Sequence, residues 1–170
     1  MSKKAIILID DFYQDMEVWY PYYRLIEAGF DVKMVGKEAN KTYTGKFGYP
    51  AVSHVAASQI KGGQCDVVVI PGGWAPDKMR LVKEMVAIVK EATDAGKVVA
   101  SICHGGWMLV SANVLKGKTA TSYIAIKDDL VNAGAKYVDQ EVCVDGKLVT
   151  SRKPDDLPAF MRAILKLASA

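Results

Sequence analysis

A cysteine, a histidine and two glycines in succession form the stretch of this sequence that is best suited to chemistry. Residues 98–110 read VVASICHGGWMLV, which is an apolar run, then Cys103 and His104, then apolar residues at helical spacing. This pattern predicts a strand, a sharp turn and a helix, with Cys103 on the turn. There the thiol would project clear of a sheet, and backbone N–H groups at the start of the helix would lie beside it to stabilise negative charge.

The same position bears on the protonation of the thiol. A helix N-terminus favours the thiolate, so we expect the pKa of Cys103 to lie below the free value of about 8.5. The alternative is that Cys103 is one more small, buried residue at the end of a core strand. His104, Gly105 and Gly106 favour the reactive interpretation, because a nucleophile needs a neighbouring base and room for the close approach of backbone.

Two further side chains are candidates to handle protons beside Cys103. His104 adjoins it in sequence, and imidazole titrates near neutral pH. The other histidine, His54, has no motif around it and is interpreted as structural. Glu17 follows the first predicted strand closely enough to reach the same crevice, although a solvated glutamate on a helix is the alternative. A carboxylate beside a thiolate raises the thiol pKa, so we expect a protonated Glu17 to donate a hydrogen bond to the sulfur.

The elements that position these residues follow from the hydrophobic pattern. Short apolar runs predict buried strands at 5–9, 31–35, 66–70 and 98–102. Helical stripes predict helices that contain 19–26, 82–89, 124–133 and 154–167. The alternation predicts an α/β fold, a flavodoxin-like three-layer α/β/α sandwich with a mostly parallel sheet. Ligands bind beyond the carboxyl ends of such strands, so Asp10, Pro71 and Cys103 should face one crevice.

Turn residues complete the expected fold. Asp15 is expected to cap the first helix. Residues 42–55 are rich in glycine and turn residues, which predicts a short hairpin before a brief helix through Ile60. Asp145 and Gly146 between two apolar segments predict a second, tight hairpin.

Length and composition narrow the class of protein. A chain of 170 residues, about half of them hydrophobic, predicts a single domain over residues 1–170. The net charge of +3 and the scattered basic residues give no indication of a nucleic acid or membrane partner. Met1 to Ala5 lack the apolar core of a signal peptide, and three cysteines without metal-ligand spacing suit a reducing compartment. We therefore expect a cytoplasmic protein without a bound metal.

Four segments together resemble the PfpI intracellular-protease family. This family belongs to the superfamily of the parkinsonism-associated redox protein, glyoxalase III and the class I glutamine amidotransferases. The segments read DFYQDMEVWYPYYRL, VVVIPGGWAPDKMRL, ASICHGGWMLVSANVLKGK and IKDDLVNAGAKYVDQEVCVDGKLVTSRKPDDL. They occur in the family's order and cover nearly the whole chain. The resemblance implies a cysteine nucleophile, no cofactor, and self-association as a dimer or a hexamer.

The resemblance also implies roles for single residues. Glu17 matches the glutamate of the family motif, and Gly72 begins a turn after the third predicted strand. The N–H of Gly73 would join that of His104 as an oxyanion hole. Asp77 matches an acid that, in the resembled peptidases, orients the histidine from a neighbouring subunit. The walls of the pocket would be Trp74, Trp107 and Tyr123.

Three functions fit this set of residues. In the first, which we rank highest, Cys103 adds to methylglyoxal or an early glycation adduct while Glu17 and His104 move protons, as in glutathione-independent glyoxalases and protein deglycases. In the second, Cys103 attacks a peptide amide, and Asp77 across a subunit boundary orients His104. In the third, the protein is a redox sensor or chaperone-like stress protein in which Cys103 oxidises to a sulfinate held by Glu17.

Overall fold

A seven-stranded sheet forms the centre of the computed structural model, which describes residues 2–169. Its strands are β1 (Lys4–Leu8), β2 (Asp31–Gly36), β5 (Val55–Ala56), β6 (Val67–Ile70), β7 (Val98–Ile102), β10 (Cys143–Asp145) and β11 (Leu148–Ser151). They lie in the order β10-β11-β7-β6-β1-β2-β5, and each neighbouring pair is parallel except β10 with β11. The succession β2-β1-β6-β7-β11 is the order of a flavodoxin-like sheet, which confirms the predicted fold class.

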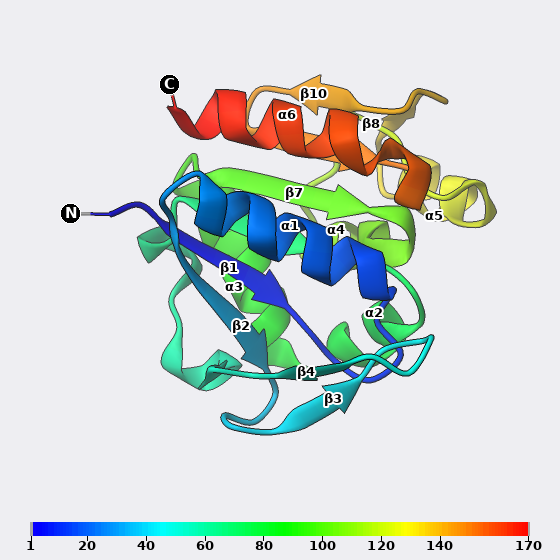
Figure 1. Ribbon diagram of the computed structural model, residues 1–170. Helices are drawn as coiled ribbons and strands as arrows, with labels where there is room; N and C mark the ends of the chain where they lie inside the picture. Colours follow the sequence, from blue (N-terminus) through cyan, green and yellow to red (C-terminus); the bar gives the residue numbers. More distant parts are fainter. Residues whose placement is uncertain (1, 170) are drawn as a thin grey trace.

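Helices cover both faces of this sheet. Figure 1 shows α1 (Asp15–Glu27) and α6 (Leu157–Ser169) side by side on one face, while α3 (Lys83–Asp94) lies behind the sheet. Next to α3 lies α4 (Gly106–Ser111), the short helix after the predicted turn. Because both faces are covered, every residue of β6 and β7 is buried, as continuous apolar runs predict.

The remaining elements are short and lie around the rim of the sheet. They are α2 (Ala75–Met79), α5 (Lys127–Asn132), and a small parallel pair, β8 (Thr119–Ala120) with β9 (Lys136–Tyr137). The helix predicted through Ile60 is a single 3-10 turn over Ala57–Gln59, and α2 was not predicted. Five residues are too few to display an apolar stripe, so a helix of this length leaves no periodic signal.

Met1, where the expectation about a signal peptide begins, and Ala170 lie outside the described residues. Within residues 2–169, every helix is too short or too polar to cross a bilayer.

The glycine-rich stretch forms the predicted hairpin. Its strands, β3 (Thr42–Thr44) and β4 (Pro50–Val52), pair antiparallel outside the main sheet. In Figure 1 the hairpin lies below β2, and its turn reaches the start of α1. The tip, residues 45–49, is therefore held against a different part of the fold from its own strands.

Asp15 makes that connection and does not cap α1 as predicted. The side chain of Gln14 is the cap, because its Oε1 accepts from the N–H of Met16 at 2.8 Å. The carboxylate of Asp15 instead accepts from the backbone N–H groups of Phe47 and Tyr49, at 2.9 and 3.0 Å. The carboxylate of Asp15 therefore binds the hairpin tip, and Gln14 caps the first turn of α1 in its place.

Candidate active site

The loops that follow β1 and β6 are joined to each other at the carboxyl edge of the sheet. Tyr13 and Gly73 form an antiparallel bridge, and the N–H of Trp74 donates to the carbonyl of Phe12 at 2.9 Å. Asp10 was predicted to share the crevice of Cys103, but it is nearly buried and lines a separate hollow beside β2. The bridge turns the later residues of the first loop, rather than Asp10, towards β7.

Cys103 lies on the sharp turn that the sequence predicts. β7 ends at Ile102, a 3-10 turn covers Cys103–Gly105, and α4 follows. Cys103 has a φ of +60°, the left-handed region that residues with a Cβ rarely adopt. The loop after β6 packs tightly against this turn, because a Cβ at Gly72 would lie 2.6 Å from the Cβ of Cys103. A glycine is therefore required at position 72 for the two loops to meet.

Glu17 projects from the first turn of α1 into this junction and is completely buried. Its Oε2 accepts from the N–H of Gly72 at 2.7 Å, whereas its Oε1 lacks an ordinary hydrogen-bond partner within the described residues. Burial raises the pKa of Glu17 to about 8, although hydrogen bonds from Gly72 and the Cys103 thiol oppose the rise. The carboxyl is therefore protonated at neutral pH, and Cys103 is the polar side chain that faces it.

The thiol of Cys103 is held in its neutral form. Burial, and then the charge that Glu17 would carry, raise the pKa of Cys103 to about 12, against opposing hydrogen bonds from the N–H groups of His104 and Gly73. The expectation of a lowered thiol pKa is therefore wrong, because α4 has only six residues and the thiol is only 8% exposed. The two N–H groups expected to form an oxyanion hole both approach the sulfur.

His104 is placed to take the thiol proton. Its Nδ1 lies 3.4 Å from the sulfur of Cys103. Burial and the charge of Lys46 lower the pKa of His104, so the imidazole is neutral at neutral pH and can act as a base. The ring stacks on Tyr123 at 5.0 Å between centroids and meets Trp107 edge-on at 5.3 Å. These two aromatic contacts fix the orientation of the imidazole ring, so that Nδ1 points towards the sulfur.

The sulfur opens on a cavity of about 320 Å³. Five of the predicted site residues line it, namely Cys103, His104, Gly73, Trp74 and Tyr123. Glu17 and Gly72 do not, since they lie behind the sulfur. Within residues 2–169 there is no cluster of three His, Cys, Asp or Glu side chains that could hold a metal ion.

Two lysines of the cavity lining were not predicted. Lys46 comes from the hairpin tip, where the surrounding glycines indicate a turn but not its direction. Lys153 follows β11, so the rule that ligands bind beyond strand ends could have found it. Both lysines bring positive charge to the cavity, whereas the residues predicted to line it are the reactive pair Cys103 and His104, a glycine and aromatic side chains.

A second hollow, of about 510 Å³, lies on the other side of His104. Trp107 and Asp77 line it, so they are near the histidine but outside the cavity of the sulfur. Within the described part of the chain, the Asp77 carboxylate makes no hydrogen bond to His104. The indole N–H of Trp107 donates to Asp129 at 2.8 Å, which fixes this wall.

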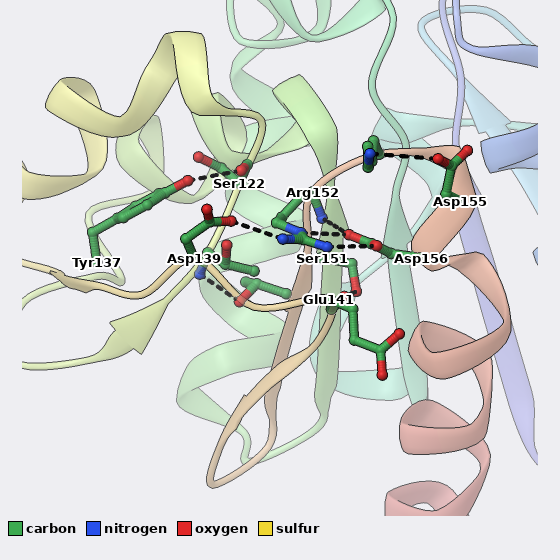
Figure 2. Close-up of polar contacts among 11 residues, drawn as sticks. Ser122, Tyr137, Asp139, Glu141, Ser151, Arg152, Asp155 and Asp156 are labelled. Atoms are coloured by element: carbon green, nitrogen blue, oxygen red, sulfur yellow. Dashed lines mark hydrogen bonds and ion pairs between the residues drawn. The ribbon is translucent and has the colours of Figure 1, made fainter.

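Arg152 is the centre of a network of ion pairs and hydrogen bonds after β11, which Figure 2 shows. Arg152 lies between two carboxylates, with its Nη1 2.8 Å from Asp139 and its Nε 2.9 Å from the nearly buried Asp156. The hydroxyl of Tyr137 donates to the carbonyl of Ser122 at 3.0 Å. These contacts fix the backbone on either side of Tyr123 and Lys153, and Arg152 itself contributes no group to the cavity.

His54 has the structural role expected of it. Its Nδ1 accepts from the backbone N–H of Met34 at 2.8 Å, and its ring stacks on Tyr22. It lies beside β2, away from the cavity.

Comparison with known proteins relates nearly the whole chain to one family. The DJ-1/PfpI family matches residues 3–167. The protein named Deglycase PfpI of Pyrococcus furiosus is 43% identical over 164 residues, which cover 96% of this chain and 98% of that relative. A protein of Bacillus subtilis named Putative cysteine protease YraA is 41% identical over 167 residues, or 98% of this chain and 99% of that relative.

A solved structure from Anabaena variabilis supports the same relation. That protein has a DJ-1/ThiJ/PfpI-like domain and a ferritin-like domain, and it matches with a TM-score of 0.95 at 44% identity. The match covers 97% of this chain and 48% of that one, so this chain spans about half the length of the two-domain protein.

The strained turn predicts that Cys103→Gly is more stable than Cys103→Ala. Both variants lack the thiol, but only glycine avoids the cost of a positive φ, about 1 kcal/mol for a residue with a Cβ. Urea unfolding of the two variants measures the difference. Equal stabilities, or a more stable alanine variant, would show that the turn stores no strain at this residue.

The buried Glu17 predicts how stability depends on pH. Its folded-state pKa is raised from 4.5 to about 8, so its contribution is complete below pH 4.5 and is lost as the pH rises through 8. Glutamine cannot ionise, so the wild type should lose stability relative to Glu17→Gln over this range. Urea unfolding of both proteins at several pH values measures the difference in their free energies of unfolding. The titration of the two histidines contributes equally to both proteins and cancels in this difference. A difference that does not change with pH would contradict the raised pKa.

Proposed function

The chain belongs to the DJ-1/PfpI family, and we propose that it is a cysteine-nucleophile enzyme that acts on reactive carbonyl compounds. The reaction would be that of a glutathione-independent glyoxalase or a protein deglycase, with methylglyoxal or an early glycation adduct as substrate. The observation that carries the proposal is the meeting of Cys103 and His104 at one cavity, with a protonated Glu17 buried behind the sulfur. The name of the Pyrococcus furiosus relative, a deglycase, supports the same class.

The first step is addition of the thiol to the aldehyde. Nδ1 of His104 accepts the proton of Cys103 as the sulfur–carbon bond forms and the carbonyl electron pair moves to oxygen. The N–H groups of Gly73 and His104 approach the sulfur, so they lie within reach of the new oxyanion. Donors of this kind are worth roughly 3 kcal/mol of barrier each. Return of the proton from the imidazolium to this oxygen gives a neutral hemithioacetal.

The second step moves a proton between neighbouring carbon atoms. His104 takes the proton from the carbon that bears sulfur, which gives an enediol, and the proton returns to the adjacent carbon. The hydroxyl proton on the sulfur-bearing carbon passes to the neighbouring oxygen, which leaves a 2-hydroxy thioester on Cys103. One water then cleaves the thioester to a 2-hydroxy acid and the free thiol. One carbon is oxidised and its neighbour is reduced, so the reaction balances without an external oxidant or reductant. Methylglyoxal would give lactate.

Glu17 acts in this scheme through the sulfur. It does not line the cavity, so it is a positioning residue that keeps a proton opposite Cys103. The low exposure of Cys103 disfavours a redox sensor, because selective oxidation follows the exposure of the thiol. When a substrate enters the cavity, its carbonyl carbon is the electrophile to which the sulfur bonds as His104 accepts the thiol proton.

Peptide hydrolysis is the second candidate, and the placement of Asp77 supports it. Asp77 is exposed and lines the outer hollow together with His104, yet makes no hydrogen bond to it within residues 2–169. A copy of the chain seated on this hollow would bring a second carboxylate to the imidazole. The Bacillus subtilis relative is named a putative cysteine protease. A dimer or a hexamer is the assembly we propose for this candidate.

The carbonyl mechanism predicts lactate from methylglyoxal without added glutathione. Cys103→Ser should lower kcat by at least about a thousandfold, because the hydroxyl is a far weaker nucleophile at neutral pH. Glu17→Gln should lower kcat to a smaller extent, since glutamine preserves the shape of the side chain but lacks the acidic proton of the carboxyl group. Cys65→Ser is the matched control, because Cys65 is a buried cysteine outside the cavity. Absence of turnover in the wild type would exclude this function.

The peptidase candidate predicts activity that depends on assembly. Cleavage of a fluorogenic peptide amide should fall as the protein is diluted to single chains, because the orienting carboxylate would be lost. Light scattering at each dilution gives the mass. Peptide cleavage that persists undiminished in a monomer would contradict a shared site, and no cleavage at any concentration would exclude the candidate.

A further inference from the structure

The β3–β4 hairpin delivers one side chain to the candidate active site. The backbone N–H of Lys46 donates to the carbonyl of Tyr13 at 2.7 Å, and the N–H of Phe12 donates to Thr44 at the same distance. The carboxylate of Asp15 holds the other side of the tip, as described above. The tip is thus fastened to the loop after β1 on both sides of Lys46, whose side chain lines the cavity.

Among residues 2–169, the ammonium group of Lys46 forms no ion pair. Its Nζ lies 5.3 Å from the ring centroid of Trp74 and 5.6 Å from that of Phe47. Aromatic faces attract a cation but do not neutralise its charge. Within the described residues no carboxylate lies in ion-pair distance of Nζ. The same charge lowers the pKa of Glu17, Cys103 and His104, so it acts on every reacting group.

The remainder of the cavity adds to this positive charge. Lys153 pairs with Asp155 at 3.4 Å, but both side chains are half or more exposed, so the pair is weak. The other polar side chains of the lining, among residues 2–169, are Gln14, Tyr123, His104 and Cys103, and none of them is Asp or Glu. Glu17 behind the sulfur is protonated at neutral pH. A ligand therefore meets two ammonium groups, of which Lys153 is weakly paired with Asp155 outside the lining.

We propose that this cavity selects substrates that carry a carboxylate in addition to the two adjacent reacting carbonyls, and that Lys46 is the residue that determines this specificity. Lys153 assists from the opposite segment. A lysine ammonium is a compact point charge that suits a small carboxylate, and about 320 Å³ suits a molecule of a few carbon atoms. The inference deepens the proposed function by naming its substrate class, and its test is independent of turnover.

Two alkylating reagents of nearly equal size make the test. Iodoacetate and iodoacetamide both form a sulfur–carbon bond as iodide leaves, but only iodoacetate carries a carboxylate. The ratio of their second-order rates at Cys103, followed by mass spectrometry, cancels any change in the pKa of the thiol. In the wild type this ratio should exceed that of the urea-unfolded protein.

Removal of the Lys46 charge should lower the ratio. Lys46→Met keeps the length of the side chain over Trp74 and should reduce the ratio about fivefold, the effect of one charge at several ångströms in water. Lys153→Met should reduce it less. Lys90→Met, on α3 away from the cavity, is the matched control and should leave it unchanged. An equal ratio in Lys46→Met and the wild type would overturn the proposal.

A second variant moves Lys46 without removing its charge. A Cβ at Gly45 would collide with the carboxylate of Asp15, so Gly45→Ala should displace the hairpin tip and also lower the ratio.

Glyoxylate should protect Cys103 from iodoacetamide at lower concentration than the uncharged glyoxal does, in the wild type but not in Lys46→Met. Equal protection by the two in the wild type would overturn the proposal. A lowered ratio without lactate formation would support it and exclude only the reaction.

Discussion

The chain reverses direction at Cys103 with a φ of +60°, and the rest of the site is arranged around that reversal. The turn lifts the sulfur off the end of β7, where the N–H groups of His104 and of Gly73 in the loop after β6 face it. It also requires that the loop after β6 pass so close that position 72 has no room for a side chain. The parallel pairing of Ile70 with Ser101 sets that distance, so the register of the sheet determines the geometry of the thiol.

Exclusion of water then decides how the site is charged. Glu17 and Cys103 are both buried, so each keeps its proton at neutral pH, and His104 is neutral for the same reason. A site that is uncharged at rest has no standing thiolate. Its reactivity arises when a bound carbonyl and the imidazole Nδ1, 3.4 Å from the sulfur, act on the thiol together.

The sequence predicts the sheet, its flanking helices and the turn at Cys103, because buried parallel strands and strand-to-helix turns have strong local patterns. It predicts the meeting of Glu17, Cys103 and His104 only as neighbours along strand ends. It fails where the outcome depends on competition in space. The thiol pKa is set by burial that no local pattern shows, and Asp15 binds a hairpin thirty-odd positions away instead of its own helix. Lys46 was missed for that second reason.

The hairpin that carries Lys46 forms its own two-stranded sheet and packs Tyr43 and Ala51 into the core, whereas Phe47 and Tyr49 at its tip are exposed. The sheet and the turn at Cys103 supply the reactive thiol, and the hairpin supplies a charge over it through a few backbone hydrogen bonds. Substitutions at the hairpin tip can therefore change which molecules are admitted while leaving the sheet and the turn at Cys103 in place. In this architecture, substrate selectivity resides in the hairpin tip, outside the central sheet. The tip can therefore change in sequence faster than the residues that carry out the reaction.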